Sequence, residues 1–235
     1  MRAIFLADAH LRSPQDKNYR LLLDFLNRQQ GLDALFLLGD IFEFWVGYRH
    51  LVFANYVPLL ESLRRLTQAG TKLYFVEGNH DFHLGPYFTE TLNCTVIPDQ
   101  RQIEWDSLKI MLCHGDLLKP DPSYRRLRSF WRSWPVRAMS RLVHPDLLWE
   151  FAIWLSNRSH KNNPGNRHHD PTPHLISFSE TPPAAGSRIV ICGHFHYPVE
   201  TQHRDVKLIA LGDWINQFSY AEMQNGEIGL RTFTA

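Results

Sequence analysis

Cysteine is scarce in this sequence, and the few cysteines present form no pairing pattern. Cys94, Cys113 and Cys192 are odd in number and show no C-x-x-C spacing, so a disulfide framework is excluded. Cys113 and Cys192 lie inside apolar runs, where small buried side chains are expected. The sequence therefore predicts a protein of a reducing compartment, the cytoplasm.

Long hydrophobic runs are also lacking. The first apolar stretch, residues 3–7, is too short for the hydrophobic part of a signal peptide and ends at Asp8. No apolar run approaches the roughly 18 residues needed to span a bilayer. We expect a protein that can touch a membrane surface but does not cross it.

Neither sign of charge is in excess. The chain has 25 Lys and Arg against 24 Asp and Glu, a formal net charge of +1. This balance provides no general attraction to nucleic acid or anionic lipid, so an anionic partner must be held by a local patch. With 235 residues, of which 44% are hydrophobic, the chain can bury a sizeable core in one domain, with or without an insertion.

Short apolar runs alternate with amphipathic stretches in the first part of the chain. Strands are expected at 3–7, 35–38 and 73–76, and helices at 17–30 and 51–69. This order predicts parallel strands covered by helices. Further strands are expected at 102–105, 109–113, 188–192, 207–211, 220–223 and 228–233. Little helical signal separates the later ones, so part of their sheet should be antiparallel. The expected fold class is α/β, with two packed sheets and helices outside.

An Arg- and Trp-rich segment interrupts this pattern. Residues 119–163 look helical, and Pro135 and Pro145 break them into pieces. We therefore predict a core of residues 1–118 and 164–235, and a helical insertion at 119–163 that covers the active site as a lid. Residues 162–173 have the composition of a loop. Three histidines lie in or next to this loop, namely His168, His169 and His174, and surface histidines are more common in such a loop than a third metal site.

Polar side chains follow the apolar runs at the point where each predicted strand ends. They are Asp8, His10, Asp40, Asn79, His114, His194 and His196. The carboxyl ends of parallel strands meet at one edge of a sheet, where ligands bind. Oxygen and nitrogen ligands suit Mn, Fe, Zn or Co. Seven such groups are too many for one metal but suit two metals sharing a carboxylate, and Asp40 is the best bridge.

Each of these motifs alone has an ordinary structural explanation, because a single Gly-Asp is more often a turn than a site. All of them in this order at predicted strand ends are hard to obtain by chance. Glycines adjoin them where tight turns or close backbone approach are needed: Gly39, Gly78, Gly115 and Gly193.

The motifs D-x-H, G-D, G-N-H-D, H-G-D and G-H-x-H, in this order, resemble the calcineurin-like metallophosphoesterases over nearly the whole chain. The resemblance implies a four-layer α/β/β/α sandwich of two mixed sheets around two divalent ions, with Mn²⁺ expected. It assigns one ion to Asp8, His10, Asp40 and His196. It assigns the other to Asp40, Asn79, His114 and His194. His80 would stabilise the transition state or protonate the leaving oxygen, and Asp81 would orient His80.

Within that family, the sequence is most similar to the UDP-2,3-diacylglucosamine hydrolases. Residues 38–45 look like their L-G-D-x-F-x-x-W segment, residues 81–85 resemble their D-F-x-L-G, and residues 211–214 (L-G-D-W) also match a form seen there. The resemblance implies cleavage of the pyrophosphate of UDP-2,3-diacylglucosamine in lipid A synthesis, giving UMP and 2,3-diacylglucosamine 1-phosphate. A metal-bound hydroxide would attack the α-phosphorus. One position departs from this pattern, since His80 stands where many of these hydrolases carry Arg.

A lipid-linked UDP-sugar needs a cation for phosphate, an apolar slot for acyl chains and access to a membrane. The insertion can supply all three, with Arg125, Arg128 and Arg158 for phosphate and its tryptophans for the slot. The alternative is that the aromatic side chains only pack the insertion and the arginines are solvated. Further expected substrate contacts are Asn79, His80, Asp121, Tyr124, Ser159, Lys161 and His194; Asp121 can equally cap a helix that begins with Pro122.

Three other functions remain open on the sequence. The same chemistry can serve another phosphoester, such as a nucleotide, a cyclic nucleotide or a phosphoprotein. A non-catalytic scaffold would be expected to lack ligands, and none is missing here. A nuclease would want a longer basic groove. We expect the cytoplasmic face of the inner membrane as a peripheral partner surface, no nucleic acid and no obligate protein partner.

Overall fold

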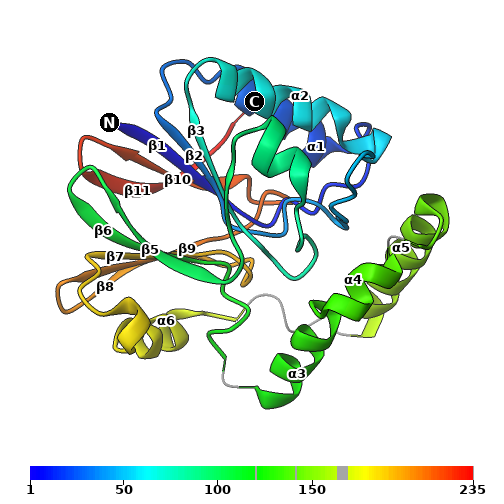
Figure 1. Ribbon diagram of the computed structural model, residues 1–235. Coiled ribbons are helices and arrows are strands. Elements are labelled where there is room, and N and C mark those ends of the chain that lie inside the picture. The colour runs from blue at the N-terminus through cyan, green and yellow to red at the C-terminus, as the bar shows by residue number, and fades with distance from the viewer. Residues whose placement is uncertain (120, 141, 163–168, 235) are drawn as a thin grey trace.

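Two β-sheets packed face to face form the body of the protein in a computed structural model, with helices on their outer sides (Figure 1). The structure describes residues 1–119, 121–140, 142–162 and 169–234, without the side chains of 159–162. The expected α/β class with two mixed sheets is confirmed.

The first sheet has six strands in the order β11-β10-β1-β2-β3-β4. Their bounds are β1 Arg2–Leu6, β2 Ala34–Leu37, β3 Lys72–Val76, β4 Thr95–Ile97, β10 Ser219–Gln224 and β11 Glu227–Thr232. Strands β1 to β4 are parallel, whereas β10 and β11 are antiparallel to their neighbours. The predicted βαβαβ order is therefore confirmed.

The second sheet has five strands in the order β5-β6-β7-β9-β8. Their bounds are β5 Gln100–Trp105, β6 Leu108–Cys113, β7 Ile189–Cys192, β8 Pro198–His203 and β9 Val206–Leu211. Strands β6, β7 and β9 are parallel, and β5 and β8 run antiparallel at the two edges. Part of this sheet is antiparallel, as predicted.

Successive side chains of each strand point to opposite faces of the sheet, and this divides the core into layers. In β1, Ile4 and Leu6 face the helices, while Ala3 and Phe5 face the second sheet. The helices on that side are α1 Lys17–Asn27 and α2 Val57–Gln68, the latter preceded by the 3-10 turn η1 Ala54–Tyr56. Because both faces of each parallel strand are covered, these strands are apolar over most of their length, with polar residues only at their first positions.

The outer face of the second sheet is covered by α6 Thr172–Ser179 and η3 Pro182–Ala184. Cys113 and Cys192 are buried in this layer, and Cys94 is buried among the helices of the first sheet. All three cysteines are free thiols, as the sequence predicts.

Several elements differ from the sequence-based expectation. The strands β4 and β8, the helix α6 and the short π-helix η2 Tyr87–Thr91 were not predicted. Both strands lie at sheet edges, where polar residues weaken the apolar pattern on which such predictions rest. The helix expected at 51–69 begins only at residue 54, as a 3-10 turn.

Three helices occupy the segment predicted to be an insertion: α3 Pro122–Trp131, α4 Trp134–Ser140 and α5 Pro145–Asn162. Each has a proline in its first turn, where the missing N–H needs no partner. Figure 1 shows them as an arm beside the sandwich, at the end away from the N-terminus. Within the described residues, none of the protein's helices has both the length and the apolar character required to cross a membrane.

Candidate metal centre and active site

The carboxyl ends of strands from both sheets converge on one cluster of candidate ligands, most of them buried. Three overlapping groups have ligand atoms within 4.8 Å of one another: Asp8, His10 and His196; His10, Asp40 and His80; and Asp40, His114 and His194. Asp40 belongs to the second and third groups, the position expected of a bridging carboxylate. Asn79 joins the third group, since its Oδ1 lies 3.1 Å from His114 Nε2.

Five of these residues have a left-handed backbone, which is uncommon for residues other than glycine. Their φ angles are 52° for Asp8, 45° for His10, 53° for Asp40, 72° for His194 and 49° for His196. Such conformations cost of order 1–3 kcal/mol each and cluster at functional sites. The strain is therefore an independent indication of function at this cluster.

Two glycines allow the loops to approach the carboxylates closely. A Cβ at Gly78 would lie 2.2 Å from Asp40 Oδ1 and 2.5 Å from the Asp40 amide nitrogen. A Cβ at Gly193 would lie 2.5 Å from Asp8 Oδ2. Close backbone approach beside the predicted ligands is thus confirmed at both positions.

We expect Gly78→Ala to displace Asp40 and to remove most phosphoester turnover. Overpacking of this kind also lowers the free energy of unfolding by about 1–3 kcal/mol, which urea denaturation would measure. Gly229→Ala is a matched control, because its Cβ meets only ordinary contacts at 3.7 Å or more. Wild-type turnover in Gly78→Ala would contradict the expectation that activity depends on the position of Asp40.

Three imidazole rings contact the surrounding protein through Nδ1, on the side away from the centre of the cluster. The contacts are His10 Nδ1 to Glu43 Oε2 at 3.4 Å, His114 Nδ1 to the Leu38 carbonyl at 2.8 Å and His196 Nδ1 to Asp213 Oδ2 at 3.5 Å. Their Nε2 atoms face the carboxylates at the centre of the cluster. Histidines that bind a metal have this arrangement, in which the second ring nitrogen contacts a carboxylate or carbonyl.

Two buried polar atoms that face the centre of the cluster, Asp8 Oδ1 and His10 Nε2, lack a hydrogen-bond partner among the described residues, as does His10 Nδ1 on the Glu43 side of the same ring. Leaving such atoms unpaired costs about 1–3 kcal/mol each. A divalent cation would satisfy the two atoms at the centre, and the surrounding nitrogen and oxygen donors suit one. The residues present therefore fit a metal site.

Three groups of the cluster are in the ionisation state that binds a metal, whereas the Asp40 charge outweighs burial at His114 and raises the pKa of that ring to about 10, so it holds a proton that a metal would displace. Burial lowers the pKa of His10 to about 4 and that of His194 to about 3, so both rings are neutral near pH 7. Burial alone would raise the pKa of Asp40, but His114 and the neighbouring histidines outweigh it and lower the pKa well below the usual value. Neutral imidazole and ionised carboxylate are the forms that bind metals.

His80 is oriented by a different residue from the one expected. The sequence suggested Asp81, but the Asp81 carboxylate accepts hydrogen bonds from the backbone N–H groups of Asp40, Ile41, Phe42 and Gly78. His80 Nδ1 instead lies 2.9 Å from the Glu43 carbonyl oxygen. The interpretation of Asp81 is corrected on this point, since it braces the two ligand loops against each other.

Glu43 is the main residue that the sequence reasoning missed. It is buried, it lies three residues after Asp40, and its carboxylate contacts His10 and His80. A signal was present, because a lone acidic residue stands in the aromatic run 42–45. Buried carboxylates need a charged or hydrogen-bonding partner, so such a residue indicates a site.

Helix α3 is fastened to the ligand loops through two arginines. Arg128 Nε donates to Asp116 Oδ2 at 2.7 Å, and Tyr124 Oη donates to the same oxygen at 2.9 Å. Arg132 donates to Glu77 Oε2 at 2.8 Å and to the Gly78 carbonyl at 2.7 Å. The role of Arg132 was not anticipated, since nothing in the sequence separates it from the other arginines of this helix.

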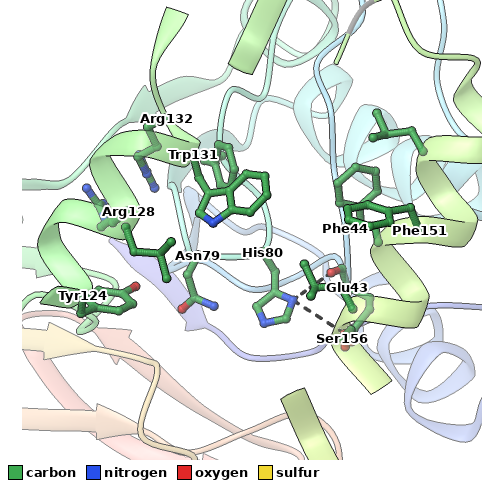
Figure 2. A pocket seen from close by; sticks show the side chains of 15 residues that line it. Glu43, Phe44, Asn79, His80, Tyr124, Arg128, Trp131, Arg132, Phe151 and Ser156 are labelled. Atoms are coloured by element: carbon green, nitrogen blue, oxygen red, sulfur yellow. Dashed lines mark hydrogen bonds and ion pairs between the residues drawn. The ribbon is translucent and has the colours of Figure 1, made fainter. Parts of the chain in front are cut away.

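A cavity of about 340 Å³ lies between α3 and α5, with Asn79 and His80 in its wall (Figure 2). Apolar side chains make up most of its lining, and they are Phe44, Phe82, Leu127, Trp131, Leu148, Phe151, Ala152 and Leu155. Its polar lining is Glu43, Asn79, His80, Tyr124, Arg128, Arg132 and Ser156. The arrangement combines an apolar chamber with a polar wall at the metal cluster.

The expected substrate contacts fall into three groups. Asn79, His80, Tyr124 and Arg128 line the cavity, and His194 belongs to the metal cluster. Asp121 caps α3 by accepting from the Ser123 and Tyr124 amides, which is the alternative weighed for it. Arg125 and Arg158 are not among the lining residues, and Arg158 stacks over Trp154. The side chains of Ser159 and Lys161 lie outside the described residues.

The histidines of the predicted loop form no third cluster among the described residues. His174 stacks on Phe195 with ring centroids 6.2 Å apart, and His169 is exposed. His168 lies outside the described residues. The tryptophans of the insertion differ in their surroundings. Trp149 packs on Phe53 and Tyr56 of the core, whereas Trp131 lines the cavity.

Comparisons with known proteins identify the family of the chain. Residues 1–198 match the model of a family described as calcineurin-like phosphoesterase. A UDP-2,3-diacylglucosamine hydrolase of Pseudomonas paraeruginosa is 31% identical over 227 residues, with 92% of each chain covered. One of Yersinia pseudotuberculosis is 28% identical over 243 residues, with 99% of each covered. An archaeal phosphodiesterase of known structure shares the fold, with a TM-score of 0.53 at 14% identity over 99% of this chain and 100% of that one.

Proposed function

The chain belongs to the calcineurin-like phosphoesterase family and is a metal-dependent phosphoester hydrolase; from this premise we propose that its substrate is UDP-2,3-diacylglucosamine. The products would be UMP and 2,3-diacylglucosamine 1-phosphate, released by attack of water on the α-phosphorus. Relatives that bear this name are about 30% identical over more than 90% of the chain, which supports the proposal.

The cavity between α3 and α5 is the observation that carries the proposal. A soluble nucleotide does not need an apolar chamber of about 340 Å³ beside the phosphate site, whereas acyl chains do. We assign the chamber to the acyl chains and the wall formed by Asn79 and His80 to the pyrophosphate. In this assignment residues 119–163 form the lid of the active site.

We further propose that two divalent ions, with Mn²⁺ expected, are held by Asp8, His10, Asp40 and His196 and by Asp40, Asn79, His114 and His194. When bound, such ions neutralise charge on the phosphoryl oxygens and activate water near neutral pH. The chain's own residues orient the substrate and exclude bulk water. The apolar lining closes the chamber, and the loops after β2 and β3 place Asp40 and Asn79 side by side.

His80 is assigned to the leaving oxygen. Burial disfavours its charged form, but the charges of Asp40 and Glu43 outweigh burial and raise the pKa of His80. A raised pKa keeps the ring protonated to higher pH, so it can donate a proton or a hydrogen bond. Because Nδ1 contacts the Glu43 carbonyl, Nε2 remains for the substrate.

The exposed side of the helical arm is proposed to lie on an anionic membrane surface, the cytoplasmic face of the inner membrane. Its large exposed apolar residues include Phe130, Trp134, Met139, Leu142 and Leu147. Arg125 and Arg126, on α3, are also exposed, and they precede Phe130 by only a few residues. Basic helices with exposed Trp and Leu commonly bind at lipid interfaces, from which a lipid substrate would enter.

The experiment compares hydrolysis of UDP-2,3-diacylglucosamine and bis-p-nitrophenyl phosphate, a small diester, with Mn²⁺ present. Phe151→Ala should lower kcat/KM for the lipid substrate about tenfold by removing part of the chamber wall. The small diester should be hydrolysed at the wild-type rate. Trp154→Ala is a matched control, since this neighbouring aromatic residue is 53% exposed and does not line the chamber.

Release of UMP with these variant effects would support the lipid substrate. Turnover of the small diester alone would support the metal-dependent hydrolase but indicate that its substrate is another phosphoester, such as a nucleotide. Wild-type kcat/KM for the lipid substrate in Phe151→Ala would contradict the assignment of the chamber.

A further inference from the structure

The buried carboxylate of Glu43 lies between the metal cluster and helix α5. Glu43 is 3% exposed, and Oε2 is 3.4 Å from His10 Nδ1. Oε1 is 3.7 Å from His80 Nδ1, and the Glu43 carbonyl oxygen is 2.9 Å from the same nitrogen. The dashed lines at the His80 ring in Figure 2 mark these contacts. One residue thus touches both a candidate metal ligand and the proposed proton donor.

The two imidazoles also contact each other, so their orientations depend on one another. The His10 and His80 rings pack edge to face with centroids 4.7 Å apart. The hydrogen bond of His80 Nδ1 with the Glu43 carbonyl and the 3.4 Å contact of His10 Nδ1 with the Glu43 carboxylate favour the orientation in which Nδ1 of each ring points to Glu43. A shift of Glu43 would therefore turn both rings.

Helix α5 reaches Glu43 from the other side. Ser156 Oγ donates a short hydrogen bond to Glu43 Oε1, and the Arg12 guanidinium lies 3.1 Å from the same oxygen. Arg12 also donates to Ser156 Oγ at 3.2 Å and to Asn157 Oδ1 at 2.9 Å. The helical arm thereby supplies one hydrogen bond to the buried Glu43 carboxylate, and Arg12 of the core supplies an ion pair.

We propose that Glu43 is a positioning residue for His10 and His80, and that α5 holds Glu43 in place through Ser156. Docking of α5 would then align the proton donor when the chamber is formed. The inference rests on the proposed function as a metal-dependent hydrolase, but it does not depend on the lipid substrate.

The first test is Glu43→Gln, which keeps the shape of the side chain and removes its charge. Loss of a residue that orients a metal-binding histidine typically weakens metal affinity or activity about 10–100-fold. Calorimetric titration of Mn²⁺ into the metal-free protein should show one of two sites weakened by such a factor. Turnover of bis-p-nitrophenyl phosphate should fall in kcat, with KM little changed.

The second test separates Ser156 from its neighbour on the same helix. Ser156→Ala should lower kcat for the small diester about threefold to tenfold, less than the roughly 10–100-fold loss typical of a direct partner. Asn157→Ala removes a contact between α5 and Arg12 without touching Glu43, and should leave this kcat unchanged. In the Glu43→Gln background, Ser156→Ala should have no further effect, because residues that act through one group are not additive.

The coupling between Ser156 and Glu43 would be overturned if Ser156→Ala kept the wild-type kcat. It would also be overturned if Ser156→Ala lowered kcat by the same factor in the wild type and in Glu43→Gln. Unchanged Mn²⁺ affinities in Glu43→Gln would overturn the positioning of His10. Circular dichroism and thermal unfolding identify a variant that fails to fold. If the wild type binds Mn²⁺ but hydrolyses neither substrate, the proposed function fails, while the Mn²⁺ titration still reports on Glu43.

Discussion

Asp40→Ala is expected to remove phosphoester turnover and one or both metal ions together. Asp40 Oδ2 lies 3.4 Å from His114 Nε2 and 3.7 Å from His10 Nε2, between the two halves of the cluster. Without this carboxylate neither ion keeps its full set of ligands. Loss of a single electrostatic contact in an active site costs about 10²–10³-fold in kcat, so losing a shared ligand should exceed 10³-fold.

The measurement is metal content per chain by mass spectrometry, together with turnover of bis-p-nitrophenyl phosphate. Asp205→Ala is the matched control, because this aspartate is exposed in a turn and lies outside the cluster. The bridging role would be wrong if Asp40→Ala bound two ions with wild-type affinity. Retained turnover with one ion would instead indicate a mononuclear mechanism.

His80→Ala is expected to lower kcat about 10²–10⁴-fold, the usual contribution of general acid–base catalysis, and to leave metal content nearly intact. The reason is geometric. His80 contacts Glu43 through Nδ1 and lies in the wall of the substrate cavity, beside the ligands Asn79 and Asp40. Its loss removes a proton donor but none of the proposed ligands.

Metal content and kcat are measured on the same preparation, with His50→Ala as a control at an exposed histidine. Loss of metal along with activity would show that His80 is itself a ligand, which its place in a group with His10 and Asp40 would then explain. An unchanged kcat would assign the proton transfer to another group.

The fold could be predicted where burial on both faces makes strands apolar over most of their length. The strands β1, β2, β3, β6, β7 and β9 were predicted for this reason. The edge strand β4 has only three residues, and the edge strand β8 carries four consecutive polar residues at 200–203, so neither gives a buried-strand pattern. Helix α6 was missed because a loop-like composition precedes it.

The candidate ligands could be predicted for a related reason. In parallel sheets, the residue that follows a strand reaches a shared edge, whatever the rest of the chain does. Asp8 and Asp40 follow neighbouring parallel strands of the first sheet, so the order of the strands brings them together, whereas His114 follows β6 of the second sheet and reaches them because the two sheets pack face to face. Their assignment as metal ligands remains a proposal that the Asp40 variant tests.

What the sequence by itself determined is the class of fold, the strand-end cluster and the chemistry that its donors suit. Those features depend on side-chain type and on periodicity, both of which are local in the chain. Only the tertiary structure decided which carboxylate faces which imidazole. Glu43, and not Asp81, contacts His80, and Ser156 from α5 completes the contacts of Glu43. Such pairings are set by packing between segments that are distant in the chain, 37 residues apart for Glu43 and His80 and 113 for Glu43 and Ser156, and no local pattern records them.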